Sequence, residues 1–330
     1  MRILSRVRRS RSRTRVVWAG RPRMCVLAIC ASMAAFTAGC NSGGQSAAAG
    51  GGGGGERLRV IAAENFWGSI ASQVGGEKVA VQSVIVDPNT DPHSYEPSAA
   101  DARMMAGAQL AIVNGLGYDN WAPKLLAASP AEGSLQRAVL NVGELLGLRQ
   151  GDNPHQWYSP ASVKRVAEGI VADYDKLDPA NAGYYAERER ELETSGLARY
   201  DELRAQIRQR YAGTPVGYSE SIVRPLGEDL GLKLLTPYSF AKAIAEGTDV
   251  TAADKRTVDE QVEQGKVKVW VFNSQNVTPD VRRVNEIARA KGVPIATVTE
   301  TMTPASDSFQ QWQVAQLEGL LRALHKATGR

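Results

Sequence analysis

Two of the three histidines in this chain of 330 residues stand in near-copies of one short motif. His93 lies in the segment Asp91-Pro92-His93-Ser94-Tyr95, and His155 lies in Asn153-Pro154-His155-Gln156-Trp157. Because a proline fixes its own φ at about −65°, the backbone before each ring is stiff and presents the imidazole at low entropic cost. Such loops suit two ligands of one metal ion, although two unrelated surface histidines beside turn prolines would give the same pattern.

The first 39 residues have the composition of a secretory signal peptide. They contain nine arginines and no acidic residue, and the last arginine is followed by an apolar run from Met24 to Ala38. This run is shorter than the roughly 20 residues of a spanning helix, which favours a cleaved signal over a transmembrane anchor. Thr37-Ala38-Gly39-Cys40 resembles the lipobox of bacterial lipoproteins, although Leu, Val or Ile usually stands in place of Thr37. Cys40 is the predicted site of lipidation.

Cysteine usage and charge limit what the mature chain does. All three cysteines, Cys25, Cys30 and Cys40, lie in or at the end of the leader, so a metal site must use nitrogen and oxygen ligands. Removing the nine leader arginines from the net charge of +4 leaves about −5, which excludes nucleic acid as a partner. Residues 40–56 are mostly Gly, Ser and Ala, a composition typical of a flexible tether.

The mature chain predicts an α/β fold with two lobes. In residues 57–176 we expect strands at 58–63, 79–86 and 110–114, and helices at 66–74, 98–107, 121–128 and 160–175. In residues 214–330 we expect strands at 216–219, 233–235, 267–272 and 294–298, and helices at 251–264 and 281–291. Short apolar strands separated by helices of this length indicate mostly parallel sheets flanked by helices.

Residues 177–213 are expected to form one long helix that joins the lobes. Asp178 and Pro179 are typical of a helix start, and Gly213 is typical of a helix end. About 33 helical residues would span on the order of 50 Å. Gly196 is the one interior residue that favours a break. The apolar positions keep no heptad, which favours a helix packed along a globular body over a coiled coil. Two lobes joined in this way form a cleft, and ligands of parallel sheets bind beyond the carboxyl ends of the strands.

Three segments and the long helix resemble one protein family. The segments are residues 91–98, 111–119 and 153–157, of which the first is the most specific. The family is the metal-binding lipoproteins of bacterial ATP-binding-cassette importers for manganese and zinc, known as cluster A-I solute-binding proteins. The resemblance covers nearly all of the mature chain.

The resemblance implies four metal ligands, two from each lobe. The first two map onto His93 and His155. The third, His or Glu in the family, stands about a dozen residues before a Gly-Leu pair, which points to Glu220 here. The fourth is usually an Asp after the last strand, and this chain offers Glu300, with Asp307 as the alternative. Two other interpretations stay open, because Glu220 could cap the following helix and Glu300 could be a solvated loop residue.

The function implied by the resemblance is capture of a divalent metal ion, manganese or zinc, and its delivery to an ABC permease. We expect a monomer that is not an enzyme and that is anchored by lipid to the outer face of the cell membrane. Carboxylate ligands favour manganese, yet zinc competes strongly at any such site, so the metal stays open. His325 is expected on the surface.

Two other functions remain as alternatives. A protein that binds a siderophore or another chelated metal would line its cleft with Arg, Tyr and Trp. Five aromatic residues could serve there, although packing around the imidazoles is their expected role: Trp67, Tyr95, Tyr118, Trp157 and Tyr238. A metal-dependent hydrolase is less favoured, because the sequence has no His-Glu-x-x-His, Gly-x-Ser-x-Gly or Gly-rich phosphate-loop motif.

Overall fold

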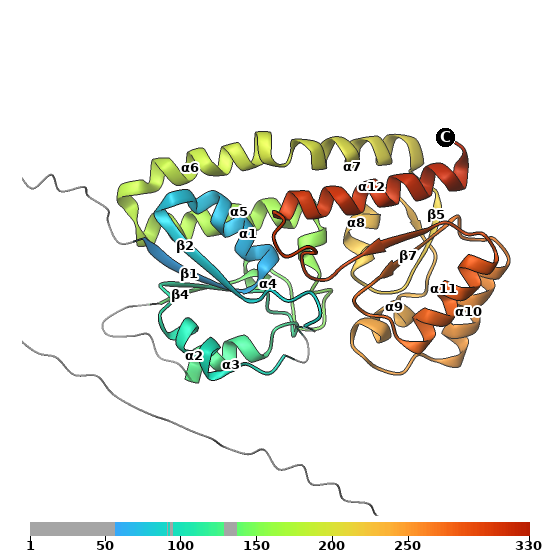
Figure 1. Ribbon diagram of the computed structural model, residues 1–330, viewed down its shortest axis with the longest axis horizontal. Helices are drawn as coiled ribbons and strands as arrows, with labels where there is room; N and C mark the ends of the chain where they lie inside the picture. Colours follow the sequence, from blue (N-terminus) through green and yellow to red (C-terminus); the bar gives the residue numbers. More distant parts are fainter. Residues whose placement is uncertain (1–56, 91, 93–94, 129–136) are drawn as a thin grey trace, which may run out of the picture. The chain divides into compact units, whose positions relative to one another are not determined.

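The first lobe is built on a four-stranded parallel sheet with the strand order β2-β1-β3-β4 (Figure 1). The computed structural model describes residues 57–90, 92, 95–128 and 137–330, which belong to one compact unit. The strands are β1 (Leu58–Glu64), β2 (Val79–Ile85), β3 (Leu110–Val113) and β4 (Ala138–Asn141). All four residues of β3 are buried, as expected for a central strand covered on both faces.

Helices cover this sheet, and three of them begin at residues whose side chains accept hydrogen bonds from free amides of the first turn. Ser98 and Asp101 form a capping box at α2, and Ser159 followed by Pro160 opens α5. The helices of this lobe are α1 (Asn65–Gly75), α2 (Ala99–Ala106), α3 (Trp121–Ala128), α4 (Val142–Leu145) and α5 (Pro160–Leu177). A 3-10 turn, Gln156–Tyr158, directly follows His155.

The second lobe repeats the topology of the first. Its parallel sheet has the order β6-β5-β7-β8, which is the order of the first sheet counted from its own first strand. The strands are β5 (Pro215–Tyr218), β6 (Lys233–Leu234), β7 (Val269–Asn273) and β8 (Ile295–Val298). Its helices are α8 (Val223–Asp229), α9 (Tyr238–Ala245), α10 (Ala252–Glu263), α11 (Pro279–Ala290) and α12 (Phe309–Thr328). The expected fold class, two α/β lobes with parallel sheets, is confirmed.

The segment expected as one helix over residues 178–211 has two irregularities. A 3-10 turn (Pro179–Asn181) precedes α6 (Ala182–Glu191), because the Asp178 carboxylate binds Asn181 and the Tyr185 hydroxyl instead of capping the first turn. A π-helical turn (Leu192–Gly196) then separates α6 from α7 (Ala198–Tyr211). The break occurs at Gly196, whose lack of a side chain lowers its helix propensity.

One continuous hydrophobic core connects the two lobes. It contains Val60 and Ile112 from the first sheet, Val216 and Val271 from the second, and residues of α5, α6, α7 and α12. Helix α12 runs beside α7 and reaches α1, where the Phe309 amide donates to the Ser69 hydroxyl at 3.0 Å (Figure 1). The lobes are therefore joined by the α6–α7 segment and also by α12. Among the described helices, none is both long and apolar enough to cross a membrane.

Candidate metal centre

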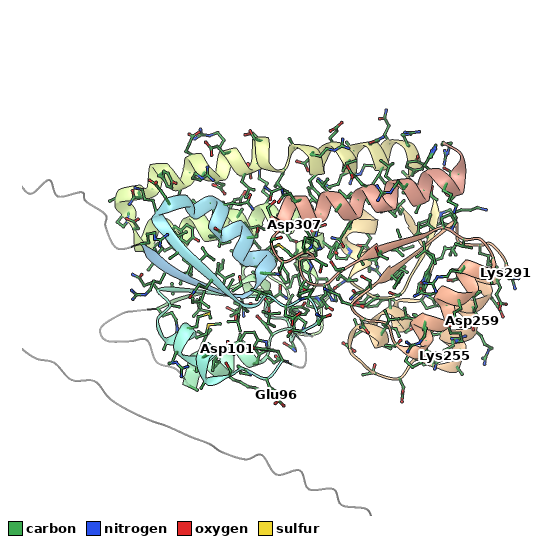
Figure 2. The ribbon with its side chains drawn as sticks, in the orientation of Figure 1. Glu96, Asp101, Lys255, Asp259, Lys291 and Asp307 are labelled. Atoms are coloured by element: carbon green, nitrogen blue, oxygen red, sulfur yellow. The ribbon has the colours of Figure 1, made fainter. Side chains whose placement is uncertain are left out.

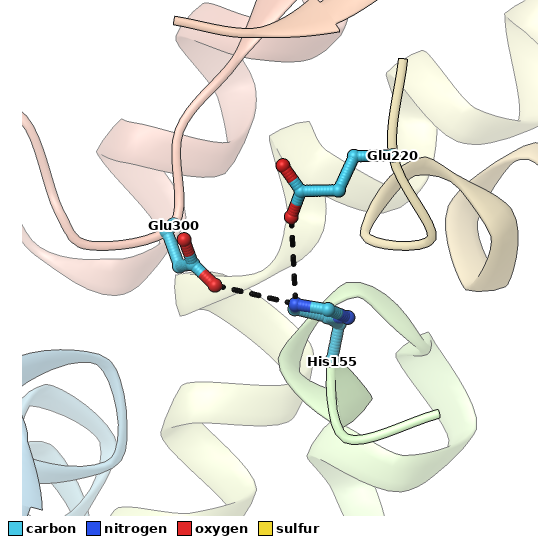
Figure 3. A group of neighbouring side chains, drawn as sticks. All are labelled: His155, Glu220 and Glu300. Atoms are coloured by element: carbon cyan, nitrogen blue, oxygen red, sulfur yellow. Dashed lines mark hydrogen bonds and ion pairs between the residues drawn. The ribbon is translucent and has the colours of Figure 1, made fainter. Parts of the chain in front are cut away.

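Three predicted ligands, His155, Glu220 and Glu300, meet at one point between the two sheets (Figure 3). The imidazole Nε2 of His155 lies 3.3 Å from Oε1 of Glu300 and 3.7 Å from Oε1 of Glu220. Ligand atoms held at about 2.0–2.2 Å from a tetrahedral ion lie roughly 3.3–3.6 Å apart, so the two distances from Nε2 are close to those between ligands of one ion. All three candidate ligand atoms lie within 4.8 Å of one another. All three residues are buried, with exposed fractions of 0%, 0% and 6%.

The carboxyl ends of the strands position these side chains. Glu220 lies two residues after β5, and Glu300 lies two residues after β8. The Gln275 side-chain carbonyl accepts from the backbone amides of Glu300, at 2.7 Å, and Thr301, at 3.0 Å, which fixes the loop that carries Glu300. The carboxyl ends of parallel strands share one edge of a sheet, so residues far apart in sequence converge there.

Asn153 holds the His155 ring in one orientation. Its side-chain oxygen contacts Nδ1 of His155 at 2.7 Å and accepts from the His155 amide at 3.1 Å, while its Nδ2 donates to the Ser221 carbonyl at 2.8 Å. Because the side-chain nitrogen of Asn153 donates to Ser221, the side-chain oxygen is the atom that faces Nδ1 of His155. Nδ1 therefore carries the proton, and Nε2 presents its lone pair to the two carboxylates. Three buried acceptors that face one point need a cation there, either a metal ion or a proton on Nε2.

The loop of His155 is also tied to the first sheet. Asn114, which follows β3, donates from Nδ2 to the Pro154 carbonyl at 3.1 Å and accepts from the Trp67 indole at 3.0 Å. The turn after it requires a glycine, since Gly115 has φ +73° and an added Cβ would lie 2.3 Å from Oδ1 of Asn141. The segment 111–119 therefore supports the loop that carries His155.

Aromatic side chains form one wall of the centre. The Tyr118 and Trp157 rings pack edge-on against the His155 ring at centroid distances of 5.9 Å and 5.2 Å, and Phe66 stacks on Trp157 at 4.0 Å. Such packing excludes water and limits motion of the imidazole. Of the other expected aromatics, Tyr95 packs on Trp121, whereas Tyr238 packs on the Arg224 guanidinium and lines a small cavity with Asn153 and Ser221.

The surroundings are electrostatically negative. Burial raises the pKa of Tyr118 well above its ordinary value, and the charges of Glu300, Glu64, Glu220 and Asp119 raise it further, so the phenol stays neutral. Burial, and then the charge of Asp119, also raises the pKa of Glu64, the last residue of β1. Among the described residues neither carboxyl oxygen of Glu64 has a hydrogen-bond partner. A surplus of buried acidic groups favours a cationic ligand.

Glu64 leads to a prediction about stability and pH. A carboxyl group whose pKa is raised by folding favours the folded state most below its unfolded pKa of about 4.3, and this contribution is lost as the pH rises through the folded value. We therefore expect Glu64→Gln to be more stable than the parent at neutral pH, with a difference that shrinks toward pH 4. Urea unfolding of the metal-free proteins at several pH values measures it. Glu96→Gln, at an exposed position (Figure 2), is the control. If the free energies of unfolding of Glu64→Gln and the parent differ by the same amount at every pH, the prediction is wrong.

Two cavities border the centre. One of about 390 Å³ is lined by Glu300 and Gln275, by residues 88–90 after β2, and by residues 244–247 at the end of α9. The other, of about 130 Å³, is lined by residues that include Asn153 and Ser221. Glu300 is thus the ligand that a small hydrated ion reaches first from the larger cavity.

Of the other predicted residues, those that the structure describes are not part of this group. His93 and Cys40 lie outside the described residues. Asp307 lies in the loop before α12 and is not among the clustered side chains, so Glu300 is the better candidate (Figure 2). His325 is exposed, as expected. Helix α8 has no side-chain cap, so Glu220 does not serve as one, and the burial of Glu300 is incompatible with a solvated loop residue.

Two residues of the centre were not predicted from the sequence. Asn273, the last residue of β7, contacts both carboxylates, and Gln275 holds the Glu300 loop. In the sequence, the two residues stand at and just after the end of the buried, β-branched strand β7. This position was the only signal, and it was too weak to select them, because an amide residue at a strand end is common.

This chain is similar in sequence to several metal-binding lipoproteins. It is 29% identical over 135 residues, 39% of this chain and 43% of the other, to the manganese-binding lipoprotein MntA of Halalkalibacterium halodurans. It is 23% identical over 286 residues, 78% of this chain and 53% of the other, to the zinc-binding lipoprotein AdcA of Streptococcus pneumoniae. The chain spans about half the length of the curated relatives it matches first.

A solved structure has the same fold. The Mn-bound periplasmic metal binding protein from Candidatus Liberibacter asiaticus superposes with a TM-score of 0.68 at 21% identity, covering 81% of this chain and 100% of that one. The model of the family ZnuA, zinc-uptake complex component A, periplasmic, matches residues 60–323. The chain therefore belongs to the ZnuA family.

Proposed function

We propose that this protein captures one divalent metal ion, manganese or zinc, outside the cytoplasmic membrane and delivers it to an ABC permease. The convergence of Nε2 of His155 with one oxygen each of Glu220 and Glu300 in a buried, negative pocket carries the proposal. His93 is the proposed fourth ligand. Family membership and relatives named for manganese or zinc binding support the same function.

A role as a binding protein rather than an enzyme follows from how the ligands are used. Catalytic zinc keeps one coordination position for water and needs a general acid or base beside it. With four protein ligands, this site would enclose its ion, which suits transport. The same proposal includes that the protein is a monomer and that its partner is a permease in the membrane. A chelated-metal ligand is disfavoured because Tyr118 and Trp157 pack on His155 and leave the imidazole edge to the carboxylates.

Elemental analysis of the mature protein, purified from its own source without chelators, tests the proposal. We expect close to one equivalent of manganese or zinc per chain. A chain that contains neither metal, or that carries an organic iron chelate, would overturn the proposed function.

Replacing the third ligand is expected to change metal preference. Glu220→His exchanges a hard carboxylate for a borderline imidazole, which should raise the ratio of zinc to manganese affinity by about tenfold or more. Competition titration with equal zinc and manganese measures this ratio. Glu228→His, at an exposed position of α8, is a control. If the Glu220→His ratio equals that of the parent, Glu220 does not bind the metal.

The anchor is a separate part of the proposal. Because a Gly-rich tether precedes the first lobe, Cys40→Ala is expected to release a soluble protein that still binds metal. Membrane fractionation of cells that express each form measures the release. A Cys40→Ala protein that stays with the membrane would show that the apolar run from Met24 acts as an uncleaved anchor.

A further inference from the structure

Asn273 contacts the outer oxygens of both proposed carboxylate ligands. The residue is fully buried at the end of β7, and its Nδ2 donates to Oε2 of Glu220 at 3.0 Å and to Oε2 of Glu300 at a longer 3.4 Å. Its Oδ1 accepts from the Gln275 amide at 2.9 Å, and its own amide donates to the Ser219 hydroxyl at 3.1 Å. Because Gln275 binds the oxygen, the orientation of the carboxamide is fixed, with the nitrogen toward the carboxylates.

The inner oxygens of the same carboxylates face His155. Oε1 of each glutamate is the atom close to Nε2, whereas Oε2 of each is turned to the amide. The two oxygens of each carboxylate therefore face different partners. One oxygen faces the point where an ion would bind, and the second is held by a donor that would be lost if both oxygens turned to the metal.

We propose that Asn273 selects for zinc over manganese by restricting Glu220 and Glu300 to one donor oxygen each. Zinc in closed sites takes four ligands in a tetrahedron. Manganese favours six oxygen-rich positions, which bidentate carboxylates and water supply. An amide that holds two carboxylates by their outer oxygens therefore penalises manganese more than zinc. This inference rests on the proposed function, since it concerns the same centre and names its preferred ion.

Asn285 provides a matched control for the loss of a buried amide. It lies in α11 of the same lobe, is 3% exposed, and accepts from the Trp270 indole at 2.7 Å. Asn285→Ala therefore removes a buried hydrogen bond without touching either carboxylate. A loss of stability common to both variants is separated in this way from an effect on the metal.

The test compares Asn273→Ala with Asn285→Ala and the parent in the full chain. Zinc and manganese dissociation constants are measured by competition, and the visible spectrum of the cobalt(II) form reports coordination number. In Asn273→Ala we expect the ratio of zinc to manganese affinity to fall by about 10- to 100-fold. The strong cobalt bands of four-coordination should also weaken toward those of five- or six-coordination. The parent and Asn285→Ala should keep both signals.

Asn273→Leu keeps the approximate size of the side chain and is the second variant in case Asn273→Ala does not fold. It has no donor for either carboxylate, so the affinity ratio should fall in the same direction. An unchanged ratio and an unchanged cobalt spectrum in folded variants that still bind zinc would overturn this inference alone. A parent that binds neither zinc nor manganese would instead overturn the proposed function, and this inference with it.

Discussion

His155→Ala should reduce the affinity for zinc and manganese by more than about 100-fold. Among the described residues proposed as ligands, the His155 imidazole faces both carboxylates, so its removal leaves a void beside Glu220 and Glu300. Loss of residues that merely orient a ligand costs 10- to 100-fold in affinity, and loss of the ligand itself should cost more. Isothermal titration calorimetry of the metal-free protein measures the change.

The fold should survive this substitution. His155 lies in a loop, and the continuous core that joins both sheets is built from other residues. Circular dichroism should show parent-like helix content, and His325→Ala, at the exposed end of α12, should bind metal as the parent does. Unchanged affinity in His155→Ala would remove the central argument for the site. His93→Ala is expected to act like His155→Ala, and a selective effect of only one of them would show that the paired motifs differ in role.

The sequence predicted the repeated elements because they carry strong periodic signals. Buried strands such as β3 and β7 are nearly continuous apolar runs, and helices such as α5 and α11 begin with Ser-Pro or Thr-Pro caps. Strand β4 was missed because it is an edge strand in which only Leu140 is buried, unlike the fully buried β3, and its structure depends on pairing with β3. The π turn before Gly196 was foreseen only as a possible break, since one extra residue in a helical turn leaves the hydrophobic pattern almost unchanged.

The sequence allowed the candidate ligands to be proposed, but it did not identify the residues that surround them. The Pro-His motif indicated His155 as a candidate ligand, and the resemblance to the metal-binding lipoproteins pointed to Glu220 and Glu300. Asn273 and Gln275 could not be selected, because their value depends on which strand ends adjoin which, and that is set by the order β6-β5-β7-β8. The same limit explains Tyr95 and Tyr238, whose residue types suit a metal pocket but which pack on Trp121 and Arg224.

Metal binding should raise the thermal midpoint by roughly 10 °C when free metal exceeds the dissociation constant about 1,000-fold. At that excess the folded state gains about 4 kcal/mol, and 1 kcal/mol moves the midpoint of chains of this size by about 2–4 °C. The folded state alone gains this energy, because the ligands come from both lobes and meet only when the chain is folded. His155 precedes α5, whereas Glu220 and Glu300 follow strands of the second sheet, so the ion adds a link that the unfolded chain lacks.

This gain should shrink in acid, because protons compete with the metal for the same atoms. The lone pair on Nε2 of His155 faces two carboxylates, so a proton on that nitrogen forms two buried ion pairs that replace those made with a metal ion. Stabilisation by metal should therefore be clearly smaller at pH 5 than at pH 7.5. Differential scanning fluorimetry with and without zinc at both values measures it, with chelator-treated protein as the reference. Equal shifts at the two values would mean that no titrating ligand binds the ion, and the proposed role of His155 would then have to be abandoned.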